Sequence, residues 1–247
     1  MATGKAYQCG QVGAANAQPN VDFAASQSAN PSANSSATPQ KQNVYKTARE
    51  ITVLIEGDGN ASGVTIAKVD RTYYVLTSKH AVKKNETYTV IAGDGKKYSV
   101  AYPQIKQLAD LDLAILPFSS DRSYAIANLG NSDRVGQGDN VYVSGWPGTE
   151  QAITQRTHLV TDGRIVGLQK GDGDGYELMY GNATAPGMSG GPVLDGSGRV
   201  VGIHGRAAGN QVSGKVGINL GIPINLFLQK APQAGLSLQK LGLKSGI

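Results

Sequence analysis

The strongest indication of the fold comes from the segment Gly187-Met188-Ser189-Gly190-Gly191-Pro192-Val193. A serine stands among glycines just before an apolar run, a pattern that suits a tight loop presenting a hydroxyl and bare backbone N–H groups. Glycine lacks the Cβ that blocks a ligand's approach, and it tolerates the unusual backbone angles of such a loop. An ordinary hairpin turn has a similar composition. The segments upstream decide between these two interpretations.

Two upstream segments place a histidine and an aspartate at the ends of apolar strands. His80 stands at the end of the apolar strand in Val75-Leu76-Thr77-Ser78-Lys79-His80-Ala81-Val82. Asp112 stands just before the apolar strand in Leu111-Asp112-Leu113-Ala114-Ile115-Leu116. Serine is a weak nucleophile that needs a neighbouring base, and histidine suits that role near neutral pH. A buried carboxylate then fixes the imidazole tautomer. We therefore predict Ser189 as nucleophile, His80 as base and Asp112 as its partner, in the chain order of chymotrypsin.

These three motifs resemble the signatures of bacterial trypsin-like serine proteases, the disulfide-free relatives that include HtrA-type proteases and glutamyl endopeptidases. The separations, 112 − 80 = 32 and 189 − 112 = 77 residues, are similar to those of HtrA-type catalytic domains. The resemblance covers roughly residues 45–230. It implies a chymotrypsin-like fold in which His80 and Asp112 come from one barrel and Ser189 from the other, so that the cleft between the barrels is the active site.

The resemblance also implies an oxyanion hole made by the backbone N–H groups of Gly187 and Ser189. Such donors stabilise charge that develops only in the transition state. Met188 departs from the family pattern, which commonly has Asp or Asn before the nucleophile. Methionine cannot pair with a newly cut N-terminus, so activation by insertion of an N-terminus is not expected here.

A candidate specificity pocket follows from the same resemblance. Glutamyl endopeptidases carry Gly-Ile-His at the place of Gly202-Ile203-His204, and a hydroxyl residue at the place of Thr184. An imidazole and a hydroxyl can both donate hydrogen bonds to a substrate carboxylate, and the neighbouring Gly205 and Arg206 complete the predicted substrate-binding set. We therefore predict a preference for Glu or Asp before the scissile bond. The alternative is that His204 is a core histidine at a strand end.

Asp110 is a rival to Asp112 as the triad carboxylate, because it lies two residues earlier. On a strand both side chains would point to one face, so the spacing does not separate them. Asp112 matches the family motif directly, since Leu-Ala-Ile-Leu follows it. We favour Asp112.

Composition bounds the remaining possibilities. The chain has 247 residues, 33 glycines, a net charge of +5 and a single cysteine, so it can form no disulfide within itself. Its lysines and arginines are scattered, so we predict no nucleic-acid binding. The repeated Gly-Asp turns, as in residues 171–175, lack the closing glutamate of an EF-hand, so no metal is predicted. No cofactor is expected either.

The strand pattern predicts an all-β fold of two six-stranded antiparallel β-barrels with a short C-terminal helix. We place a protease domain at 43–231, with barrel one at about 46–120, barrel two at about 135–222 and the helix at 223–231. Residues 232–247 read as a polar tail. Residues 1–42 are rich in small and polar residues, which predicts a disordered low-complexity tail.

The chain shows no apolar signal-peptide core and no membrane span. Its localisation is therefore open, although the family resemblance favours a periplasmic or secreted protein from which an export signal has been removed. We expect protein or peptide substrates and favour a monomer. The leading functional interpretation is a serine endopeptidase acting through an acyl-enzyme. The alternative is a catalytically silent protease-fold module that binds peptides.

Overall fold

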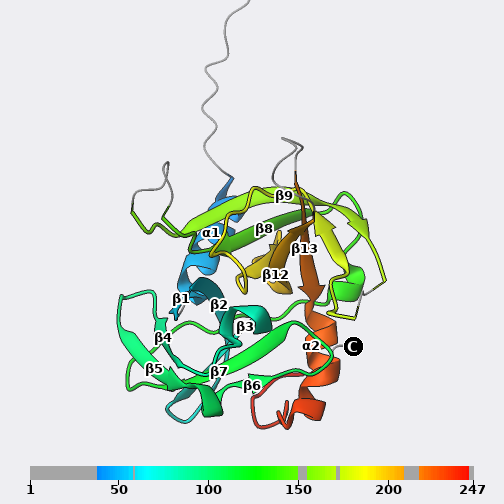
Figure 1. The fold of residues 1–247 in the computed structure, drawn as a ribbon. Helices are drawn as coiled ribbons and strands as arrows, with labels where there is room; N and C mark the ends of the chain where they lie inside the picture. Colours follow the sequence, from blue (N-terminus) through cyan, green and yellow to red (C-terminus); the bar gives the residue numbers. More distant parts are fainter. Residues whose placement is uncertain (1–37, 58, 150–154, 171–172, 209–216, 245–247) are drawn as a thin grey trace, which may run out of the picture. The chain divides into compact units, whose positions relative to one another are not determined.

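The computed structural model describes residues 38–57, 59–149, 155–170, 173–208 and 217–244, all within a unit that spans residues 37–247. Its strands form two sheets, which lie one below the other in Figure 1. In chain order the elements are α1 (Pro39–Ile51), β1 (Thr52–Glu56), β2 (Asn60–Val69), β3 (Thr72–Ser78), η1 (Lys79–Val82), β4 (Thr87–Ile91), β5 (Lys97–Ala101), η2 (Tyr102–Gln104), β6 (Lys106–Gln107), β7 (Leu113–Ser119), η3 (Ser132–Arg134), β8 (Asn140–Gly145), β9 (Leu159–Leu168), β10 (Leu178–Tyr180), β11 (Pro192–Asp195), β12 (Val200–Ala208), β13 (Ile218–Pro223), α2 (Ile224–Lys230) and η5 (Ala231–Ala234).

The first sheet is antiparallel and open, so the prediction of a closed six-stranded first barrel is wrong. It has seven strands in the order β5-β4-β1-β2-β3-β7-β6. Closure would require β5 to pair with β6. The tight turn η2, which contains Pro103, separates these two strands, and β6 has only two residues. Proline cannot donate to a strand ladder, and this favours an edge at that position.

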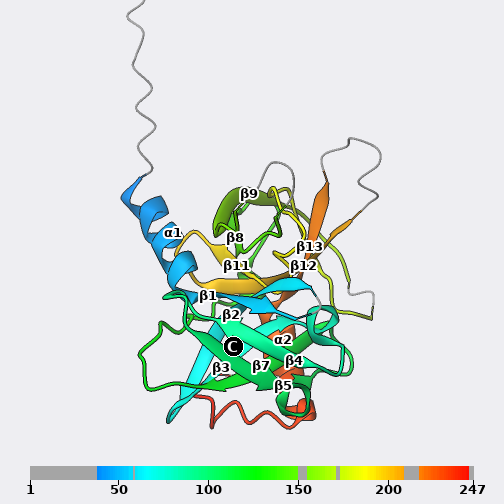
Figure 2. The same cartoon turned by 60° about the vertical axis from the view of Figure 1, so that its left-hand side comes forward.

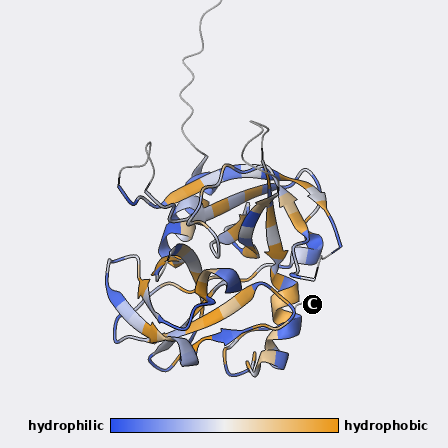
Figure 3. Cartoon of the chain, in the orientation of Figure 1, coloured by the Kyte–Doolittle hydropathy of each residue, from blue (hydrophilic) through white to orange (hydrophobic). Residues whose placement is uncertain are grey.

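The second sheet is the predicted six-stranded antiparallel barrel. It closes in the order β10-β13-β12-β11-β8-β9. Large buried side chains fill its interior, among them Met188 and Tyr180. In Figure 3 many of the hydrophobic residues, coloured orange, lie along the strands of both sheets. A separate cluster fills the space between the two sheets and includes residues of β2, β7, β12 and both helices.

The helix α1 corrects the predicted boundary of the N-terminal tail. Pro39–Gln42, assigned to the tail, form its first turn, and Lys46–Ile51, assigned to barrel one, are helical as well. Thr38 caps the helix by accepting a hydrogen bond from the Lys41 N–H, and Pro39 follows at the first position, where its missing N–H costs nothing. Val44, Ala48 and Ile51 face the core at helical spacing. Residues 1–37, including Cys9, lie outside the described residues.

The C-terminal helix is confirmed as α2, which follows β13 (Figures 1 and 2) and packs against β12 and β13. The polar tail predicted after residue 231 is corrected. Leu236 and Leu241 are only 8% and 7% exposed and belong to the cluster between the sheets. These leucines bury apolar surface against the core, which favours an ordered segment over a solvated tail.

Candidate active site

The end of β3 brings His80 beside Asp112. Ser78 at the end of β3 is paired with Leu113 at the start of β7, so the residues just beyond this pair lie at the same end of the ladder. The Lys79 N–H extends the pairing by donating to the Asp112 carbonyl at 3.0 Å. The strand register therefore brings the two side chains together before any loop geometry is considered.

Three donors hold the Asp112 carboxylate. The His80 backbone N–H donates to Oδ1 at 2.7 Å, while His80 Nδ1 and the Tyr176 hydroxyl both lie 2.5 Å from Oδ2. Burial alone would raise the pKa of Asp112. The hydrogen bonds from His80 and Tyr176 outweigh burial, so the net pKa lies below the ordinary value and the carboxylate is ionised at neutral pH.

Asp110 points elsewhere. Its carboxylate lies 3.4 Å from Lys230 Nζ on the exposed surface, in an ion pair with the end of α2. The two aspartates have different partners, and the strand spacing does not apply to them because residues 109–112 form a turn and a bend. The geometry thus brings Asp112, and not Asp110, to His80.

The loop around Ser189 is fixed by its backbone. Gly187 and Gly190 have φ values of +96° and +86°, which side chains other than glycine rarely adopt. A Cβ at Gly190 would also collide with the Ser62 carbonyl and the Thr77 hydroxyl. Met188 is fully buried in the interior of the closed barrel, so the residue that departs from the family pattern anchors the loop by apolar packing.

Ser62 of β2 ties this loop to the first sheet and was missed by sequence reasoning. Its N–H donates to the Ser189 carbonyl at 2.8 Å, and its hydroxyl donates to the Gly187 carbonyl at 2.8 Å. The same hydroxyl accepts from the Trp146 N–H at 2.8 Å. Ser62 therefore ties the nucleophile loop on both sides of Met188 to the first sheet, and its side chain also bonds the end of β8.

The Ser189 hydroxyl faces away from the base. Its Oγ donates to the Gly205 carbonyl at 2.8 Å. Within the described residues, the serine–histidine hydrogen bonds join Ser78 to the His204 carbonyl and Ser144 to the His158 ring, and none joins Ser189 to His80. His80 and Ser189 nevertheless line one hollow of about 200 Å³, so both open onto the same space.

The backbone N–H groups of Gly187 and Ser189 make no hydrogen bond to any other described residue. Their neighbours are bonded, because the Met188 N–H donates to Ala185 at 3.1 Å and the Gly190 N–H to His204 at 2.7 Å. The loop therefore leaves two amide donors uncommitted on either side of Met188.

The four residues predicted to bind the substrate contact different partners in the structure. Thr184 donates its hydroxyl proton to the Asn219 side-chain oxygen at 2.5 Å, and His204 Nδ1 lies 2.7 Å from the Tyr180 hydroxyl. The register of β12 shifts between His204 and Arg206, so Gly205 is an extra residue at a bulge. Because of this bulge, Arg206 is not beside His204 but lies over the Tyr176 ring, 4.2 Å from its centre.

Burial governs the charge of two of the three histidines. His204 is 3% exposed, and its pKa is lowered to about 4 by burial and by the charge of His80. His158, which sequence reasoning did not consider, is 8% exposed, and burial together with Arg49 lowers its pKa to about 4. Both rings are therefore neutral at neutral pH.

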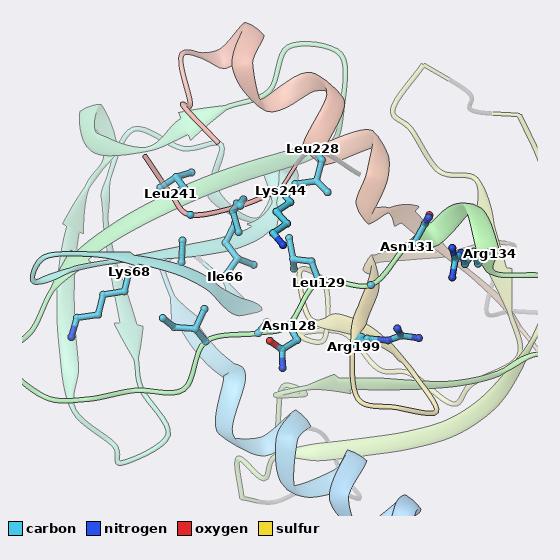
Figure 4. A pocket seen from close by; sticks show the side chains of 16 residues that line it. Ile66, Lys68, Asn128, Leu129, Asn131, Arg134, Arg199, Leu228, Leu241 and Lys244 are labelled. Atoms are coloured by element: carbon cyan, nitrogen blue, oxygen red, sulfur yellow. The ribbon is translucent and has the colours of Figure 1, made fainter. Parts of the chain in front are cut away.

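A larger hollow lies away from these groups. It measures about 640 Å³ and lies between β2, the 126–131 segment and the C-terminal segment (Figure 4). None of His80, Asp112 or Ser189 lines it, and its lining includes no carboxylate or histidine. Its size alone supplies no chemistry, so we locate the candidate active site at the smaller hollow beside Ser189.

No cluster of three or more His, Cys, Asp or Glu side chains in the described part of the chain could bind a metal ion. Of the helices that the structure describes, none has the length and apolar character needed to cross a membrane.

The family model of the trypsin-like peptidase domain matches residues 61–203, more than half of the chain. This chain belongs to the trypsin-like peptidase family. The matched range contains His80, Asp112 and Ser189. It ends just before His204, so the predicted specificity residues 204–206 lie outside it.

Relatives and solved structures agree with this family. Serine protease Do-like HtrA of Bacillus subtilis (strain 168) is 29% identical over 150 residues, covering 59% of this chain and 33% of the relative. Two structures of the HtrA-type protease AlgW, one with a decapeptide and one with a tripeptide, superpose with TM-scores of 0.63 and 0.62 at 22% and 25% identity. They cover 78% and 76% of this chain, and 67% and 61% of AlgW. The chain thus spans about a third of the length of its curated relative.

Proposed function

We propose that this trypsin-like peptidase is a serine endopeptidase with Ser189 as nucleophile, His80 as general base and Asp112 as the carboxylate that orients His80. The observation that carries the proposal is the hydrogen bond from Asp112 to His80, because His80 lines the same hollow as Ser189. Asp112 fixes the proton on Nδ1, so Nε2 is left as the acceptor that a serine nucleophile requires.

The reaction begins with a change at the nucleophile. The Ser189 hydroxyl leaves the Gly205 carbonyl and turns towards His80, a rotation about one side-chain bond. His80 Nε2 takes the hydroxyl proton while Oγ attacks the scissile carbonyl carbon. The imidazolium then gives this proton to the leaving amine as the C–N bond breaks, and water releases the acyl group by the same steps.

The uncommitted amides of Gly187 and Ser189 are the proposed oxyanion hole. They are free to donate to the carbonyl oxygen as it gains negative charge, and losing one such donor typically costs about 100–1,000-fold in rate. Ser62 bonds to the carbonyls of Gly187 and Ser189, so it holds the peptide units 187–188 and 189–190 that follow the two amide-bearing units.

Protein or peptide substrates fit the open edge of β12. The pairing of β11 with β12 ends at Pro192 and Ile203, so beyond His204 this edge has no strand partner among the described residues. An extended peptide can bind such an edge by adding a strand. AlgW, the neighbour in fold, has been solved with peptides of ten and three residues.

A preference for Glu or Asp before the scissile bond is a finer part of the proposal, and it rests on His204. The Thr184 proton is committed to Asn219, which leaves His204 Nε2–H as the donor for a substrate carboxylate. That tautomer requires the Tyr180 hydroxyl to donate its single proton to Nδ1, at 2.7 Å, instead of to the Leu220 carbonyl, at 3.2 Å. His204→Ala is then expected to reduce the Glu-over-Gln ratio of kcat/KM by about 10–150-fold. An unchanged ratio, or a library preference for Val, Ala, Lys or Arg, removes this part alone.

The second candidate, a silent peptide-binding module, is favoured by one observation, the bond from Ser189 Oγ to Gly205. A fluorophosphonate probe separates the two candidates. The endopeptidase is labelled at Ser189 and cleaves casein, whereas Ser189→Ala is folded, unlabelled and inactive. Folded wild-type protein that neither labels nor cleaves, but binds peptides, would establish the module instead.

A further inference from the structure

Tyr176 reaches from the second sheet to the carboxylate of the first. It lies just before β10, is fully buried, and donates its hydroxyl to Asp112 Oδ2 at 2.5 Å. His80 and Asp112 both come from the first sheet. The bond from Tyr176 is the third hydrogen bond to the Asp112 carboxylate, and it comes from the closed barrel. The motifs around residues 80, 112 and 189 gave no signal for it.

We propose that Tyr176 is a positioning residue that holds Asp112 in the plane and charge state that His80 needs. The inference rests on the proposed function. Oδ1 is fixed by the His80 backbone N–H, and Oδ2 is shared between the imidazole and the phenol. A carboxylate held at both oxygens cannot rotate away from the imidazole. A donor at Oδ2 also disperses part of its negative charge.

The phenol is suited to donate at every working pH. Burial, followed by the hydrogen bond to Asp112 and its charge, raises the pKa of Tyr176 far above the ordinary value. The hydroxyl therefore keeps its proton wherever Asp112 is ionised, and it acts as a fixed donor and not as a second acid.

The surroundings of Tyr176 are arranged around this hydroxyl. A Cβ at Gly205 would collide with the hydroxyl and the ring edge, so only glycine at that bulge leaves room for the phenol. Arg206 lies against the ring face and forms an ion pair with Asp174 at 3.4 Å. The Asp174 carbonyl in turn accepts the Asp112 N–H at 3.0 Å.

These contacts make Asp112, Tyr176 and Arg206 one assembly across the two sheets. Arg206 and Asp112 both line the hollow of about 530 Å³ on the far side of His80. The placement of the catalytic carboxylate thus depends on the same strand, β12, whose open edge is proposed to bind the peptide. A tyrosine that merely filled space would need neither this acceptor nor the glycine opposite it.

The test compares Tyr176→Phe with Tyr73→Phe. Both changes remove one hydroxyl from a fully buried tyrosine, but the Tyr73 hydroxyl donates to the Arg122 carbonyl in the first sheet, away from the site. Tyr176→Phe is expected to lower kcat by about 10-fold with KM nearly unchanged. Without the phenol, the more concentrated carboxylate charge holds the imidazolium more tightly. The acid limb of the kcat/KM profile is therefore expected to move up by about 0.5–1 pH unit. Tyr73→Phe leaves the limb in place.

A second measurement does not depend on turnover. The proton between His80 Nδ1 and Asp112 is followed by low-field proton NMR, and in Tyr176→Phe it is expected to shift further downfield. Gly205→Ala, which displaces the hydroxyl without removing it, is expected to shift it in the same direction. A wild-type protein without activity would overturn the proposed function while this resonance still tests Tyr176. A Tyr176→Phe protein with an unmoved resonance and an unmoved acid limb would overturn the role of Tyr176 alone.

Discussion

At the candidate site the base is already hydrogen-bonded to its carboxylate partner, whereas the nucleophile is not bonded to the base. Asp112 and His80 are joined by a strand ladder, two hydrogen bonds between the pair and the Tyr176 hydroxyl. The Ser189 backbone is held as firmly by Ser62, yet its hydroxyl donates to Gly205. The first pair is built within one sheet. Ser189 comes from the other sheet, and its hydroxyl must leave the Gly205 carbonyl before it can bond to the base.

The largest effect is expected when the Asp112–His80 pair is disrupted. Asp112→Asn removes the charge that fixes His80 and should lower kcat by about 10,000-fold, the size of effect known for this substitution in serine proteases. Asp110→Asn is the matched control, because it breaks only an exposed ion pair with Lys230 and should leave kcat within about two-fold. Rates from peptide hydrolysis decide the matter. Equal losses in both variants would contradict the assignment of Asp112.

A smaller effect is expected at the nucleophile loop. Ser62→Ala removes the hydroxyl that bonds the Gly187 carbonyl and the Trp146 N–H, while the Asp112–His80 pair keeps every contact. We expect kcat to fall by about 10–100-fold and the free energy of unfolding to fall by about 1–3 kcal/mol. Exposed Ser99→Ala serves as the control for serine removal. If Ser62→Ala weakened stability but not fluorophosphonate labelling, Ser62 would have no part in shaping the loop.

The buried histidines give the stability a pH dependence separate from the catalytic pair. For His158, with a pKa of about 4 in the folded protein, the unfolded chain takes up a proton below its usual pKa of about 6.5 while the folded chain does not. Stability is therefore full above about pH 6.5 and falls as the pH drops towards 4.

His158→Gln should reduce this slope by up to about 1.4 kcal/mol per pH unit. Urea unfolding between pH 4 and pH 7 measures it. Equal slopes in wild type and His158→Gln would contradict the burial argument.

The smallest effect is expected at the N-terminus. Deleting residues 1–37 is predicted to leave turnover within a few-fold, because every residue at the candidate site lies beyond them. Deleting residues 1–51 also removes α1 and exposes the apolar surface that Val44, Ala48 and Ile51 cover, so thermal unfolding should occur at a lower temperature. An inactive but folded 1–37 deletion would show that this segment completes the site.

Features that depend on residues a few positions apart in the chain could be predicted from the sequence alone. Glycines around Ser189, apolar strands ending at His80 and Asp112, and Pro223 before the C-terminal helix each specify local structure, and their order predicts the family. The helix α1 belonged to this class too. Its Thr38-Pro39 start and its spacing of Val44, Ala48 and Ile51 were local signals, masked by the polar composition around them.

Contacts between residues that are distant in the chain could be identified only in the folded structure. Asp112 faces His80 while Asp110 pairs with Lys230, 120 residues away. Tyr176 meets Asp112 across 64 residues, and the bulge at Gly205 sends His204 and Arg206 to different surroundings. The open first sheet is likewise a matter of which edges meet. Local patterns fix backbone conformation because the interactions act within a few residues, whereas side-chain partners depend on how two complete sheets pack.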